Sequence, residues 1–96
     1  MKDKMKILSV TDQENLRGFI KDLINRCHGE IKLIEAISGE EGIDIAKEEH
    51  PEIIFMDIGL HGLSGVDAAR KIKEVLPDVK IVMLTMYLCN SSPVGI

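Results

Sequence analysis

The spacing of apolar residues along the chain alternates between two patterns. Four short segments, near residues 5–10, 31–37, 53–56 and 79–84, are rich in apolar residues or alternate them with single polar ones. Such runs are typical of β-strands, and a run without polar residues is typical of a strand covered on both faces. The stretches between them repeat apolar residues every three or four positions, as amphipathic helices do. The pattern predicts the order βαβαβαβ.

Short polar signals mark the expected ends of the helices. Asp12 precedes the first helical stretch and is predicted to cap it, and the pair His28-Gly29 is predicted to end it. Ser38 and Glu41 form a capping-box pattern at the start of the second helix. Ser64 is predicted to cap the third.

Strands that alternate with helices favour a parallel sheet with helices on its faces, joined by right-handed crossovers. The fold class predicted for these 96 residues is therefore α/β, as one doubly wound parallel sheet. In the flavodoxin-like strand order 2-1-3-4, the first, third and fourth strands are neighbours. Ligands of such sheets bind outside the carboxyl ends of the strands, where the strand order reverses.

Three polar side chains follow those three strands: Asp12, Asp57 and Thr85. If they converge, Asp57 is placed to act as a nucleophile towards phosphorus. Asp12 and Asp57 together, with the backbone carbonyl of Gly59, provide the oxygen ligands that Mg²⁺ prefers. The Thr85 hydroxyl is then placed to bond a phosphoryl oxygen. Each residue also has a purely structural interpretation, as a turn former, a helix cap or a strand residue.

Charge and composition narrow the classes of function. A formal net charge of −4 and scattered basic residues argue against a nucleic-acid surface in this segment. No run reaches the ~18 apolar residues of a membrane span, and a cytoplasmic protein is predicted. Cys27 and Cys89 lack a ligand spacing and are predicted to be free thiols. The three histidines are far apart in sequence, which disfavours a zinc site.

Several stretches resemble the receiver domain of two-component response regulators, especially receivers attached to helix-turn-helix transcription factors. The matching stretches are residues 6–13, 53–60, 62–65, 69–73 and 82–85, and the resemblance runs from about residue 4 to residue 87. It implies that Asp57 is the phosphoacceptor and that Asp12 and Gly59 are Mg²⁺ ligands. It also implies that Thr85 is the switch hydroxyl and that a sensor histidine kinase is the phosphoryl donor.

The chain departs from that family at three places. Thr11 stands where the family usually has an acidic residue, and is expected to orient a metal-bound water instead. His61 stands where the family usually has proline. The fifth strand, with its lysine, and the last two helices have no counterpart before Ile96. Residues 1–87 are therefore predicted to form an incomplete receiver domain, and residues 88–96 an irregular tail.

The shortened sheet predicts a homodimer, formed through the edge of the fourth strand or the uncovered sheet face. The function predicted is a phosphorylation-operated switch that is not an enzyme, beyond Mg²⁺-dependent self-phosphorylation and self-dephosphorylation. The alternative is a pseudo-receiver that binds proteins or dimerises independently of phosphate. A shortened or disrupted chain is a third interpretation. A flavin-binding protein is disfavoured because the first loop lacks a Ser/Thr/Gly-rich phosphate cradle.

Overall fold

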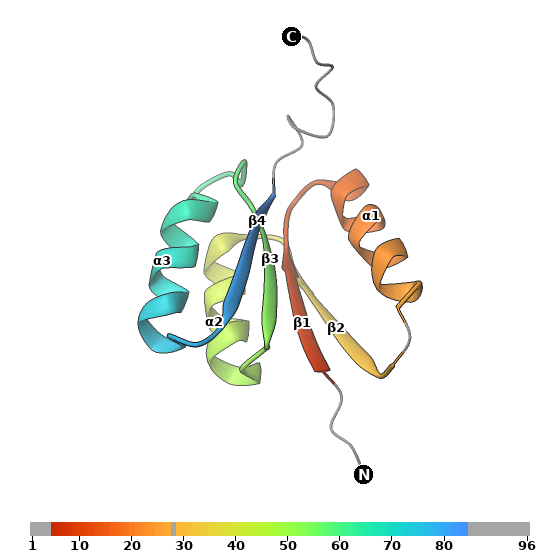
Figure 1. The fold of residues 1–96 in the computed structure, drawn as a ribbon. Coiled ribbons are helices and arrows are strands. Elements are labelled where there is room, and N and C mark those ends of the chain that lie inside the picture. The colour runs from red at the N-terminus through yellow and green to blue at the C-terminus, as the bar shows by residue number, and fades with distance from the viewer. Residues whose placement is uncertain (1–4, 28, 85–96) are drawn as a thin grey trace, which may run out of the picture.

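The computed structural model describes residues 5–27 and 29–84 of the chain. Four strands and three helices alternate along this part of the chain (Figure 1). They are β1 (Met5–Val10), α1 (Glu14–Asn25), β2 (Ile31–Ala36), α2 (Gly39–Glu49), β3 (Ile53–Asp57), α3 (Gly65–Val75) and β4 (Lys80–Leu84). The element order predicted from the apolar pattern is confirmed.

All the strand pairs are parallel, and the sheet has the order β2-β1-β3-β4. The predicted fold class and strand order are therefore confirmed. The chain leaves β2 for β3 on the far side of β1, which makes the gap between the carboxyl ends of β1 and β3 the switch point of the sheet. Among the described residues, β4 is bonded to β3 alone and forms one edge of the sheet.

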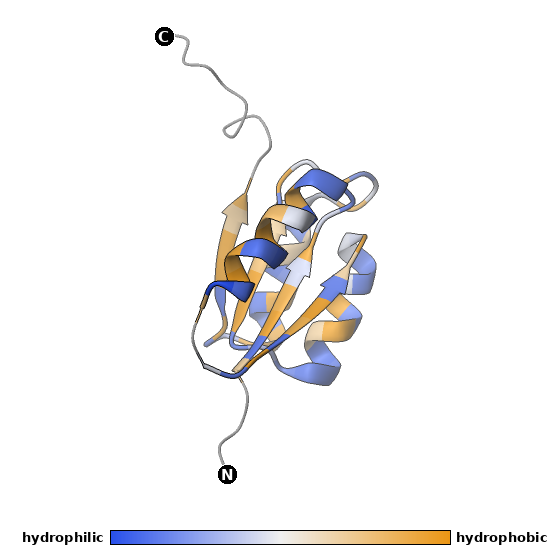
Figure 2. Ribbon diagram, turned by 90° about the vertical axis from the view of Figure 1, so that its right-hand side faces the viewer, coloured by the Kyte–Doolittle hydropathy of each residue, from blue (hydrophilic) through white to orange (hydrophobic). Residues whose placement is uncertain are grey.

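Helices α2 and α3 pack on one face of the sheet, and α1 lies on the other (Figure 1). The α2/α3 face holds the main hydrophobic core, because alternate residues of every strand point towards it. Figure 2 shows mostly apolar strands between helices in which polar and apolar residues alternate. The fully buried members of this core are Leu8, Val10, Ala46, Ile54, Met56, Ala68 and Ile72.

Side-chain caps fix the start of both helices on that face. The Ser38 hydroxyl accepts a hydrogen bond from the Glu41 N–H at 3.1 Å, and the Ser64 hydroxyl accepts one from the Asp67 N–H at 3.1 Å. The Glu41 carboxylate in turn accepts from the N–H of Ile37, one residue before the cap. The predicted caps of α2 and α3 are confirmed.

The predicted ends of α1 are wrong. Gln13, not Asp12, occupies the N-cap position, and it makes no side-chain capping bond. The carboxylate of Asp12 instead contacts His61, which lies in the loop after β3. The helix also ends at Asn25, before the His28-Gly29 pair that was expected to stop it. The backbone turns at Arg26, whose N–H bonds the carbonyl of Leu23 at 3.2 Å.

Thr85, Cys89 and the predicted tail at residues 88–96 lie outside the described residues. Within the described ranges, no helix is both long enough and apolar enough to cross a membrane.

Candidate functional site

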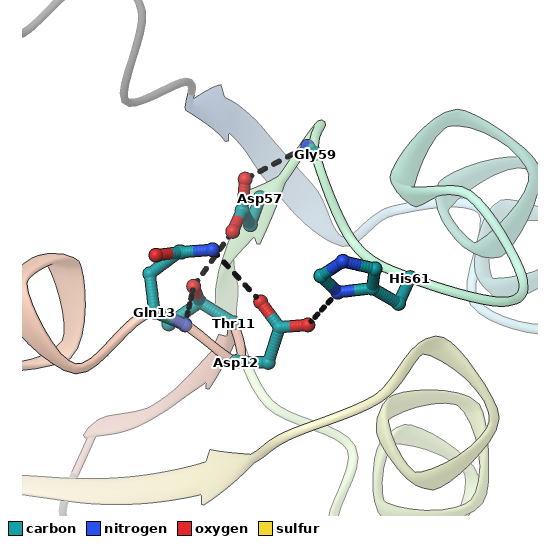
Figure 3. A network of polar contacts seen from close by, with 6 residues as sticks. All are labelled: Thr11, Asp12, Gln13, Asp57, Gly59 and His61. Carbon is teal, nitrogen blue, oxygen red and sulfur yellow. Dashed lines mark hydrogen bonds and ion pairs between the residues drawn. The ribbon is translucent and has the colours of Figure 1, made fainter.

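The candidate site lies where β1 and β3 end, at the switch point of the sheet (Figure 3). Asp57 is the last residue of β3, and Thr11 and Asp12 directly follow β1. The β1–β3 register pairs Val10 with Met56, so the two strands end side by side. As predicted, Asp12 and Asp57 therefore lie together at the carboxyl ends of two neighbouring strands.

Asp57 is buried, with only 2% of its surface exposed. Its Oδ2 accepts a hydrogen bond from the Thr11 hydroxyl at 2.7 Å, and its Oδ1 accepts one from the Gly59 N–H at 2.8 Å. A buried carboxylate is unfavourable unless such donors replace water. The two bonds hold the Asp57 carboxylate in one orientation at the rim of the core.

Thr11 is itself buried, at 1% exposure, and it links two parts of the site. Its hydroxyl donates to Asp57 and accepts from the Gln13 N–H at 3.0 Å. From the sequence, Thr11 was expected to act through a metal-bound water. In the structure its hydroxyl bonds Asp57 directly, as a neutral donor to the carboxylate.

Asp12 faces a residue that sequence reasoning treated only as a departure from the family pattern. The Nδ1 atom of His61, in the loop after β3, lies 2.7 Å from Oδ2 of Asp12 (Figure 3). This hydrogen bond raises the pKa of His61 above its ordinary value and lowers the pKa of the Asp12 carboxyl. The two residues are 49 positions apart, and no local pattern in the sequence signals the contact.

The three glycines that follow β3 along the chain have different roles. Gly59 donates its N–H to Asp57, while Gly62 has a φ of +75° that favours glycine. Gly65 packs against the backbone of Asp57, and a Cβ there would overlap the Asp57 carbonyl oxygen. The close approach of Gly65 holds the start of α3 against the end of β3. From the sequence, Gly65 was expected only to permit a tight turn.

The donor set fits a magnesium ion. Mg²⁺ is usually held by one or two carboxylates and keeps several waters, and the ends of β1 and β3 supply the carboxylates of Asp12 and Asp57. In the described ranges, no three His, Cys, Asp or Glu side chains form a metal-binding cluster. A Mg²⁺ ion there would therefore complete its shell with backbone oxygens and water. Thr85, the predicted switch hydroxyl, lies outside the described residues.

Comparison with known proteins places most of the described chain in one family. The family model of the response regulator receiver domain matches residues 7–92. A nitrate/nitrite response regulator protein homolog from Haemophilus influenzae is 33% identical over 86 residues, covering 90% of this chain and 41% of the relative. The response regulator protein VraR from Staphylococcus saprophyticus is 35% identical over 85 residues, covering 88% and 40%. The chain thus spans about two fifths of these relatives.

Solved structures of response regulators share this fold. The crystal structure of a LuxR-family two-component response regulator from Aurantimonas sp. SI85-9A1 superposes with a TM-score of 0.78 at 30% identity. The match covers 88% of this chain and 60% of that one. A response regulator receiver domain protein from Clostridium thermocellum gives a TM-score of 0.75 at 29% identity, covering 90% and 70%.

Proposed function

The chain belongs to the family of response regulator receiver domains, and from this premise we propose that Asp57 accepts a phosphoryl group in two-component signalling. The observation that supports this most directly is the buried carboxylate of Asp57 at the switch point of the sheet, held by Thr11 and Gly59. The partner proposed is a sensor histidine kinase, with its phosphohistidine as the donor. The domain works as a switch and not as a metabolic enzyme.

In the proposed transfer, one carboxylate oxygen of Asp57 forms a bond to phosphorus. The phosphorus–nitrogen bond of the donor phosphohistidine breaks, and the imidazole nitrogen leaves with the electron pair. The Thr11 hydroxyl and the Gly59 N–H keep the carboxylate oriented, so little reorganisation is needed at the moment of attack.

Mg²⁺ is the cofactor we propose, held by Asp12, Asp57 and the backbone carbonyl of Gly59, with Thr11 adjoining its water shell. When bound, it neutralises negative charge on the phosphoryl oxygens and the carboxylates. Asp12 and Asp57 stand on neighbouring strand ends, as such a site requires. In the proposal Thr85 supplies the hydroxyl that responds to the new phosphoryl charge.

The experiment is the intact mass of the chain after incubation with acetyl phosphate and Mg²⁺. We expect one phosphoryl adduct on the parent, none on Asp57→Ala, and an unchanged adduct on Asp44→Asn. Asp44 is the matched control because it is an exposed carboxylate on α2. Equal labelling of the parent and Asp57→Ala would contradict the assignment.

A second candidate function is a phosphate-independent pseudo-receiver that associates with a second copy of the chain. It is favoured by the described edge of β4, whose outer backbone groups an antiparallel copy of β4 can pair around a twofold axis. It is also favoured by Phe19 and Val82, which expose apolar surface on the α1 face. A folded parent that takes no phosphoryl group, and that shows the mass of a dimer in light scattering, would support this candidate over the first.

A further inference from the structure

His61 adds a nitrogen to a site whose other candidate ligands are oxygens. It stands in the loop between β3 and α3, next to Gly62, and its side chain is 86% exposed. The imidazole nevertheless points towards Asp12, and its Nδ1 faces the Asp12 carboxylate (Figure 3).

We propose that His61 and Asp12 form a two-residue chelate that makes this edge of the sheet bind a divalent transition metal such as Ni²⁺ in preference to Mg²⁺. The inference deepens the proposed function, because it concerns the cation at the same carboxylate edge. It concerns only metal preference, so it can be tested without any phosphoryl transfer.

The distance between the two ligand atoms fits a chelate. Neighbouring ligands of an octahedral ion, each about 2.1 Å from the metal, lie about 3.0 Å apart. The Nδ1 atom of His61 and Oδ2 of Asp12 are 2.7 Å apart. A shift of a few tenths of an ångström therefore opens the pair around one ion.

The surroundings leave room for the rest of the shell. Asp12 keeps a second oxygen, Oδ1, whose contact to the Gln13 amide is long at 3.4 Å. Because the His61 side chain is almost fully exposed, water has access to complete an octahedron. The side chain that donates to Asp57 is the neutral Thr11, so this position supplies no further carboxylate that would favour a hard ion.

Ligand chemistry sets the direction of the preference. Mg²⁺ is a hard cation that prefers oxygen, whereas imidazole suits the later first-row metals. Affinity for mixed nitrogen and oxygen sites rises from Mn²⁺ towards Ni²⁺ and Cu²⁺. A carboxylate paired with an imidazole therefore discriminates against Mg²⁺, which gains little from the nitrogen.

Isothermal titration calorimetry of the full chain with Ni²⁺ and, separately, with Mg²⁺ tests the proposal. His61→Ala is expected to lose at least about tenfold in Ni²⁺ affinity, since even outer-shell partners of a metal site are worth about 10–100-fold. Its Mg²⁺ affinity should stay equal or rise. His50→Asn, which removes an exposed histidine at the end of α2, should bind both ions as the parent does.

Unchanged Ni²⁺ affinity in His61→Ala would overturn the chelate and leave His61 as an ion-pair partner of Asp12. A second readout needs no variant: substoichiometric Ni²⁺ should broaden the imidazole NMR signals of His61 before those of His50. Broadening of both at the same ratio would also overturn the proposal. A phosphoryl adduct without His61-dependent Ni²⁺ binding contradicts only the chelate, and the reverse result contradicts only the phosphoacceptor role.

Discussion

The two faces of the sheet differ in how completely their side chains are buried. On the face under α2 and α3, the central strands present the fully buried Leu8, Ile54 and Met56. Lys6, at the start of β1, points to the same face and pairs with Glu49 of α2 at 3.2 Å. The face under α1 carries Ser9 and Glu35 on its strands, and leaves Val82 41% exposed. The hydroxyl of Ser9 is buried without a hydrogen-bond partner among the described residues.

The helices differ in the same way. Helices α2 and α3 each begin with a serine cap, whereas the N-cap residue of α1 makes no side-chain capping bond. Phe19 and Leu23 of α1 are 58% and 44% exposed. A groove of about 480 Å³ runs beside the helix, lined by Leu23 and Ile24 of α1 and by Ile53 and Phe55 of β3. Leu16 and Ile20 of α1 are buried, but this layer still leaves apolar surface exposed.

The largest expected effect contrasts the two faces directly. Ile54→Ala removes a fully buried side chain from the α2/α3 face of the sheet and should lower the free energy of unfolding by about 2–5 kcal/mol. Val82→Ala, on the α1 face, should cost less than about 1 kcal/mol because its side chain is already partly in water. Urea denaturation of both variants measures the difference. Similar losses would show that the α1 face is covered in solution.

Glycine-to-alanine changes should have opposite signs on the two faces. In α2, a Cβ on Gly42 would lie 2.9 Å from a methyl carbon of the buried Val10, so Gly42→Ala should destabilise by about 1–3 kcal/mol. In α1, a Cβ on Gly18 meets nothing within 4 Å, and Gly18→Ala should stabilise by about 0.5–1 kcal/mol through helix propensity. Thermal melts of the two variants would shift in opposite directions. A loss of stability in Gly18→Ala would mean that this side of α1 is packed against something.

The smallest expected effect concerns the ion pair between the loop that leads to α1 and the loop that leads to α3. The bond to Asp12 raises the pKa of His61 above 6.5, so the stability it contributes is complete below pH 6.5 and is lost as pH rises through the folded-state pKa. The pKa of Asp12 is lowered below 3.8, so its contribution is present above pH 3.8 and is lost as pH falls through the folded-state value. The pair therefore links the two loops best between pH 3.8 and 6.5.

NMR titration of the His61 imidazole checks this pair. In Asp12→Asn the pKa of His61 should fall back towards 6.5. An unchanged His61 titration would show that the contact with Asp12 does not form in solution.

The amino-acid sequence by itself determined the local structure and the central residue of the site. The apolar runs and helical stripes predicted every described element, because strand and helix periods are properties of neighbouring residues. Serine caps were readable for the same reason. The position of Asp57 at the end of a buried strand followed from the apolar run before it, and the strand order came from a general rule for such sheets.

Only the tertiary structure decided which distant side chains meet. In the fold, Asp12 does not cap α1 as predicted, and its carboxylate bonds His61 instead. The Thr11 hydroxyl bonds Asp57, which is 46 positions away in the sequence. The fold also places Gly42 against Val10. Such contacts depend on how two loops and two layers come together, and no local period of the sequence encodes that geometry.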